Sequence, residues 1–74
     1  MSRLAKLQTL AEIEGFESSE ELLEAFVTDS VCPGICINSG CEYTTEVEPD
    51  CAGGYCEVCG TQSVRSAMIL AGVI

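Results

Sequence analysis

The fold of this chain is decided by residues 32–60, which read CPGICINSGCEYTTEVEPDCAGGYCEVCG and contain all six of its cysteines. A C-x2-C-G turn such as Cys56–Gly60 brings two thiolates toward one metal ion, because each sulfur lies about 2.3 Å from a bound zinc. Cys36–Cys41 forms a second, wider turn that also contains a glycine. Fourteen residues separate the two turns. The spacing therefore predicts a tetrahedral metal site whose ligands are Cys36, Cys41, Cys56 and Cys59.

The rest of the sequence favours a metal over disulfides as the element that holds the fold together. A chain of 74 residues buries a small core and usually needs a disulfide or metal staple. The N-terminus lacks the apolar run and cleavage site of a secretory signal, and the apolar stretch 67–74 is too short to cross a membrane. We therefore expect a cytoplasmic protein, and the cytosol keeps thiols reduced.

Two cysteines, Cys32 and Cys51, are surplus to a site of four ligands. We expect them to be free thiols. The sequence leaves three alternatives open: Cys32 replaces Cys41 as a ligand, all six cysteines bind two zinc ions, or Cys32 and Cys51 pair as a redox disulfide. A closed four-cysteine shell leaves no coordination position for water, so zinc bound there is structural. No Lys or Arg is close to these cysteines in sequence, so backbone N–H groups are expected to balance the charge of the thiolates.

The elements around the cysteines predict a small α+β fold in a single domain spanning 1–74. A helical hairpin is expected over 1–30, with Leu4, Leu7, Leu10 and Ala11 as the apolar face of its first helix. Ser18 and Glu21 have capping-box spacing at the start of the second helix. The buried stripe of that second helix is expected to be Leu22, Leu23, Phe26 and Val27.

The region 32–62 is rich in strand formers between the two turns. A β-hairpin is expected there, pairing residues 42–47 with 55–58. A C-terminal helix is predicted over 63–74, capped by Thr61 or Ser63 and ended by Gly72. Its apolar face is expected to pack over the helical hairpin and the sheet, or alternatively to form a homo-oligomer contact.

The two cysteine turns resemble the paired knuckles of a zinc ribbon, through Cys36, Gly40, Cys41, Cys56, Cys59 and Gly60. The resemblance covers roughly residues 32–62 and departs from the usual pattern in the wider first knuckle. The layout of the whole chain is loosely similar to that of short uncharacterised zinc-ribbon proteins of bacteria and phages. Paired knuckles also resemble those of rubredoxin-type carriers, which implies iron as the alternative metal.

Charge and composition narrow the function. The chain has twelve acidic and three basic residues, for a net charge of −9, and all twelve acids lie between Glu12 and Glu57. This charge disfavours nucleic-acid and anionic membrane partners. The absence of histidine excludes Ser-His-Asp and Cys-His catalysis, and we expect no enzyme activity. The sequence predicts a zinc-stabilised protein-interaction module with a basic protein partner. The alternatives are a rubredoxin-like iron carrier, a nucleic-acid-associated zinc ribbon and a DNA-mimic inhibitor.

Overall fold

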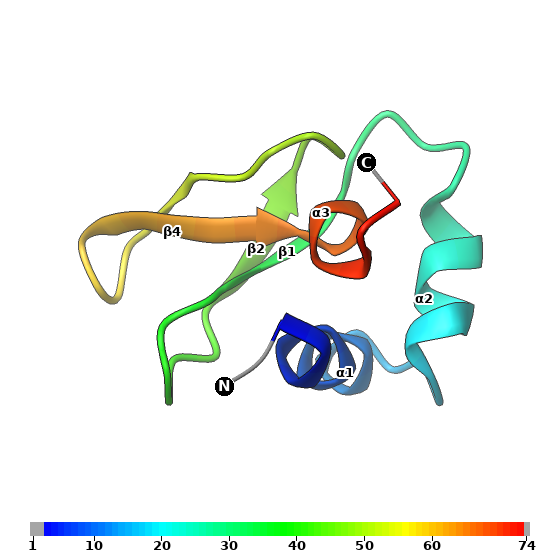
Figure 1. The fold of residues 1–74 in the computed structure, drawn as a ribbon, viewed down its shortest axis with the longest axis horizontal. Coiled ribbons are helices and arrows are strands. Elements are labelled where there is room, and N and C mark those ends of the chain that lie inside the picture. The colour runs from blue at the N-terminus through cyan, green and yellow to red at the C-terminus, as the bar shows by residue number, and fades with distance from the viewer. Residues whose placement is uncertain (1–2, 74) are drawn as a thin grey trace.

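The computed structural model describes residues 3–73 as a four-stranded antiparallel sheet with three helices on one side of it (Figure 1). The elements in chain order are α1 (Arg3–Ile13), α2 (Ser19–Phe26), β1 (Cys32–Cys36), β2 (Thr44–Val47), β3 (Gly54–Cys56), β4 (Thr61–Ser66) and α3 (Ala67–Ala71). The small α+β class predicted from the sequence is confirmed.

The sheet consists of two β-hairpins joined through their inner strands. Its strand order is β2-β1-β4-β3, so β1 pairs with β2 on one side and with β4 on the other. The predicted hairpin between the knuckles therefore has the wrong partners. Residues 44–47 do form a strand, but they pair with β1, and residues 54–56 pair with β4 at the opposite edge of the sheet. The physical reason is that residues 32–36 and 61–66 form the two central strands.

The central strand β1 packs closely against its neighbours at Gly34. A Cβ atom at this position would lie 2.8 Å from Val47 Cγ2, 3.0 Å from Val64 Cγ1 and 3.0 Å from the Arg65 carbonyl oxygen. A glycine is thus needed where two strands and the side chains of their valines approach β1. This close approach occurs on both sides of β1, toward β2 and toward β4.

The C-terminal helix begins later than predicted. Ser66, not Thr61 or Ser63, is its N-cap, and the Ser66 hydroxyl accepts a hydrogen bond of 3.1 Å from the Ile69 N–H. The predicted first turn of this helix is instead strand β4, in which Val64 pairs with Cys36. Gly72 ends the helix with φ 76°, as predicted.

The helical hairpin has the predicted N-cap at Ser18 and most of its predicted buried face, since Leu7, Leu10 and Ala11 are all buried. The Ser18 hydroxyl accepts from the Glu21 N–H at 3.3 Å, which confirms the N-cap of α2. In α1, however, Leu4 is 64% exposed, whereas Lys6 is only 1% exposed and occupies the expected place of an apolar residue. In α2 the stripe is also narrower than predicted: Leu22 is buried, and Val27 lies exposed beyond the end of the helix.

The core has two parts, one on each side of the central strands. The helices and one face of the sheet bury a cluster made of Leu7, Leu10, Ala11, Leu22, Ile35, Ala67 and Leu70. A second cluster contains Cys36, Cys56 and Val64. Neighbouring residues of β1 thus belong to different clusters, because side chains alternate across a strand. Helix α3 contributes to the first cluster, so its predicted role in the core is confirmed.

Candidate metal centre

The sheet topology brings the two cysteine turns to one end of the molecule. The first knuckle (residues 36–41) follows β1, and the second knuckle (residues 56–60) precedes β4. Because β1 and β4 are antiparallel neighbours, the end of one strand lies beside the start of the other. Each knuckle is therefore part of the turn of one hairpin, and the pairing of the two hairpins juxtaposes them.

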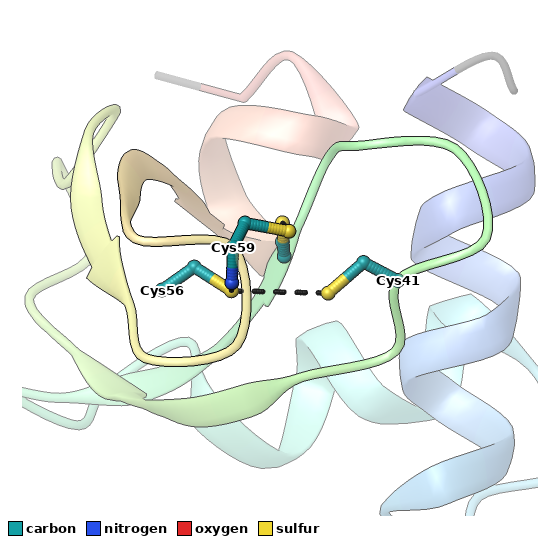
Figure 2. A group of neighbouring side chains, drawn as sticks. Cys41, Cys56 and Cys59 are labelled. Carbon is teal, nitrogen blue, oxygen red and sulfur yellow. Dashed lines mark hydrogen bonds between the residues drawn. The ribbon is translucent and has the colours of Figure 1, made fainter.

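The four predicted ligands converge at this end of the sheet. The sulfurs of Cys36, Cys41, Cys56 and Cys59 all lie within 4.8 Å of one another. Figure 2 shows three of them, from Cys41, Cys56 and Cys59, directed into the same space between the loops. Cys36 and Cys56 are buried, Cys41 is half-buried and Cys59 is exposed. Four thiols from two turns thus converge on one site, and Cys59 is the most exposed of them.

The sulfur separations match those of a tetrahedral metal–thiolate site. The Cys36 and Cys59 sulfurs lie 3.8 Å apart, and so do those of Cys41 and Cys56. A tetrahedron with metal–sulfur bonds of about 2.3 Å has edges of about 3.8 Å. Both of these short separations run between the knuckles rather than within one. The residues therefore fit a single four-coordinate ion that would bridge the two hairpins, with zinc and iron equally compatible with the sulfur set.

The two knuckle glycines adopt a left-handed backbone conformation, which glycine reaches more easily than other residues. Gly40 has φ 80° and Gly60 has φ 70°, both in the left-handed region. The chain can thus reverse within the loop, and the Gly60 N–H reaches the Cys56 carbonyl at 2.8 Å. In the same turn the Cys59 N–H donates to the Cys56 sulfur at 3.3 Å. The second knuckle is held by its own backbone.

A buried polar group supports the first ligand. The Ser63 hydroxyl lies 3.1 Å from the Cys36 sulfur and donates to it when that sulfur is a thiolate. Ser63 is in turn 2.9 Å from the Thr61 hydroxyl and accepts from the Asn38 side-chain amide at 3.4 Å. These contacts orient the serine and stabilise negative charge on Cys36. Sequence reasoning placed Ser63 in a helix and so missed this role.

The thiols of the site differ in their ease of ionisation. Burial opposes ionisation of Cys36, but hydrogen bonds from Ser63, from the Asn38 backbone and from neighbouring thiols lower its pKa to about 6. For Cys41, a backbone hydrogen bond at Tyr43 favours ionisation. Desolvation and the adjacent sulfurs act against it and raise the pKa of Cys41 to about 12. Four crowded thiols thus ionise unequally, and a bound cation would be needed to hold all four as thiolates.

A lysine lies at the first knuckle, contrary to the expectation that no basic residue is near the site. The Lys6 ammonium donates to the carbonyl oxygens of Asn38 and Cys41, and the bond to Asn38 is 2.7 Å long. These partners are 32 and 35 residues away in sequence, which is why inspection of the cysteine region alone missed them. The signal that could have found Lys6 is its position four residues before Leu10, on the face of α1 that is buried.

The two surplus cysteines lie outside the cluster. Cys32 is buried at the other end of β1, where it pairs with Val47. Cys51 is half-buried in the turn before β3, with its sulfur 4.0 Å from the Val64 carbonyl oxygen. The structure thus groups Cys41, and not Cys32, with the other three sulfurs.

Comparison with known protein families, curated proteins and solved structures finds no match for this chain. The four clustered cysteines on two glycine-containing turns nevertheless fit a zinc-ribbon-like site. Within residues 3–73, no helix is long and apolar enough to cross a membrane.

Proposed function

We propose that this protein is a small acidic interaction module whose fold is stabilised by one zinc ion bound to Cys36, Cys41, Cys56 and Cys59. A tetrahedral shell of four thiolates is closed, so the metal would have no open position for water or substrate. This supports a structural role for the ion and no catalytic activity. The ion would link the two hairpins, because each hairpin supplies two of the four sulfurs.

The observation that carries the interaction role is an apolar groove between α2 and the C-terminal segment. It is lined by Leu23, Glu24, Val27, Met68 and Val73. Val27 and Val73 are each more than 60% exposed, so the groove presents large apolar side chains to solvent. Exposed apolar side chains gathered around one groove offer a place for the apolar side chains of a partner segment.

The charge around the groove indicates the chemistry of the partner. Helix α2 carries Glu20, Glu21 and Glu24 and no basic residue. Of the three basic residues of the chain, Lys6 is buried and Arg3 lies near Gly72, next to the groove-lining Val73, so the acidic side of the groove is that of α2. We therefore propose a basic, amphipathic protein segment as the occupant, with apolar side chains in the groove and Lys or Arg facing the glutamates.

Metal analysis and peptide binding test this proposal separately. The purified full chain should contain one colourless zinc ion, and zinc contents well below one per chain would contradict the structural ion. A synthetic amphipathic Lys/Leu peptide should bind in the groove, shift the NMR signals of its lining residues, and bind more weakly as salt is added. A Lys/Ser peptide of equal charge is the matched control. Equal binding of the two peptides would mean that the interaction is non-specific charge attraction, and it would refute the groove as the binding site.

Paired valine variants localise the binding surface. Val27→Ser should weaken binding of the Lys/Leu peptide, because Val27 lines the groove. Val58→Ser is the control, since Val58 is similarly exposed, at 72% against 69% for Val27, but lies in the second knuckle. Equal effects of the two substitutions would place the binding surface elsewhere. Concentration-dependent dimerisation lost in Val27→Ser would instead assign the groove to a second copy of the chain.

An iron electron carrier is the second candidate function. It is favoured by the exposure of Cys59, which places one ligand of the site at the protein surface where a redox partner can reach it. Four thiolates also ligate iron in this arrangement. A protein purified aerobically from iron-replete cells would then show visible iron–thiolate absorbance that bleaches on reduction. One colourless zinc per chain would exclude this role.

A further inference from the structure

The first knuckle depends on a residue from outside the cysteine-rich segment. Lys6 on α1 is 1% exposed, and its ammonium donates to the carbonyl oxygens of Asn38 and Cys41. Both carbonyls belong to the first knuckle, on either side of the turn at Gly40. One side chain therefore connects the helical layer directly to the loop that carries two of the four sulfurs.

Each knuckle has its own backbone hydrogen bonds, and the first is held by a side chain from another element as well. In the second knuckle, the Gly60 N–H bonds to the Cys56 carbonyl and the Cys59 N–H bonds to the Cys56 sulfur. The first knuckle has two more residues between its cysteines, and its backbone bond runs from the Cys41 N–H to the Asn38 carbonyl at 3.1 Å. The Asn38 carbonyl thus accepts from Cys41 and from Lys6, so the lysine braces the same turn from outside.

The positive charge of Lys6 also complements the negative charge that the metal-bound thiolates would carry. A buried ammonium is costly unless it finds acceptors and compensating negative charge. Two carbonyls accept two of its three N–H groups. A divalent ion held by four thiolates carries two excess negative charges. The bond to the Cys41 carbonyl keeps the ammonium beside one of the ligand residues.

We infer that Lys6 is a positioning residue for the metal centre: it fixes the wide first knuckle in its metal-binding shape and supplies positive charge beside the thiolates. Docking of α1 and binding of the metal therefore strengthen each other. The inference rests on the metal site of the proposed function but not on its partner. If the wild-type chain binds no metal, the proposed function and this inference both fail. A Lys6 variant that binds metal as tightly as wild type overturns this inference alone.

The test is zinc affinity of the full chain, measured by competition with a chromogenic chelator. Lys6→Met should lower the affinity about 10–100-fold, the usual loss when a group that orients metal ligands is removed. Arg3→Met is the matched control, because it removes an equal charge from an exposed position on the same helix. It should stay within about threefold of wild type. In the cobalt-substituted protein, Lys6→Met should also shift the thiolate-to-metal charge-transfer band to lower energy, because positive charge near the sulfurs is lost.

A second control separates positioning from general loss of stability. Leu10→Ala truncates a fully buried side chain on the same face of α1 and should leave the cobalt band unshifted. An unshifted band in Lys6→Met, or an affinity within threefold of wild type, overturns the inference. If Lys6→Met gives no folded protein with saturating zinc, Lys6→Arg decides. Recovery of tight zinc binding by the arginine supports the role of a donor cation, and its failure overturns it.

Discussion

Replacing Gly34 with alanine tests how much the close packing around the central strand β1 contributes to the stability of the fold. Gly34 lies in β1, two residues before Cys36, the first of the four clustered cysteines. An added Cβ would meet Val47 at 2.8 Å and both Val64 and the Arg65 carbonyl at 3.0 Å. The valines can rotate or shift, but the carbonyl belongs to the backbone of β4. We therefore expect that the alanine side chain in Gly34→Ala forces β1 and β4 slightly apart.

The magnitude follows from two opposing effects. Overpacking a close-packed site costs about 1–3 kcal/mol of folding free energy. Alanine also restricts the unfolded chain and so returns about 0.4–1 kcal/mol. With the midpoints of the two ranges, the net loss is about 1.3 kcal/mol. In a domain of this size that loss lowers the melting temperature by about 5–10 °C.

The assay is thermal and urea unfolding of the zinc-saturated protein, followed by circular dichroism. Gly53→Ala is the matched control, because a Cβ there would meet only the Gln62 carbonyl, at an ordinary 3.6 Å. Gly53→Ala should be neutral or slightly stabilising. A Gly34→Ala protein as stable as wild type would refute the contact between the hairpins at this position. Equal destabilisation by both substitutions would show that the loss does not come from the close contacts around Gly34.

Three further predictions concern the thiols and their surroundings. Cys41→Ser should lose tight zinc binding while Cys32→Ser keeps it, because Cys41 lies in the sulfur cluster and Cys32 does not. The reverse result in a chelator competition would show that Cys32, and not Cys41, is the fourth ligand. Ser63→Ala should weaken zinc binding by several-fold, because it removes the hydroxyl 3.1 Å from the Cys36 sulfur; unchanged affinity would contradict this. Acid should release zinc as protons displace it from the thiolates. Since Ser63 lowers the pKa of Cys36, Ser63→Ala should raise that pKa and move the release to higher pH; a release midpoint that does not move would count against this.

Much of the site could be predicted because its chemistry is local in sequence. The C-x2-C-G and C-x4-C turns identify the cysteines that cluster, and the glycines identify where the backbone reverses. Apolar spacing and the Ser18 cap predict the two N-terminal helices, whereas for the C-terminal helix they predict the end at Gly72 but not the start. In each case neighbouring residues are sufficient, because a turn or a helical stripe depends on contacts within a few positions.

The sheet could not be predicted because its central strands contradict local preferences. Pro33 and Gly34 lie in β1, yet proline and glycine normally mark the end of an element. Residues 61–66 contain small polar side chains that are equally compatible with a helix start, and only pairing with β1 makes them a strand. The register that creates the site is therefore set by long-range contacts, which spacing along the chain does not reveal.

The position of Lys6 explains why the metal site and the helical core should form one cooperative unit. The helix face that buries Leu7, Leu10 and Ala11 in the apolar cluster also carries the lysine that holds the first knuckle. Detaching α1 would thus expose apolar surface and at the same time leave a knuckle unbraced. Conversely, loss of the metal would leave four thiols crowded at the junction of two short hairpins. If the proposed zinc ion is bound, its contribution on the order of 10 kcal/mol would allow a core this small to tolerate a buried lysine and a glycine in its central strand.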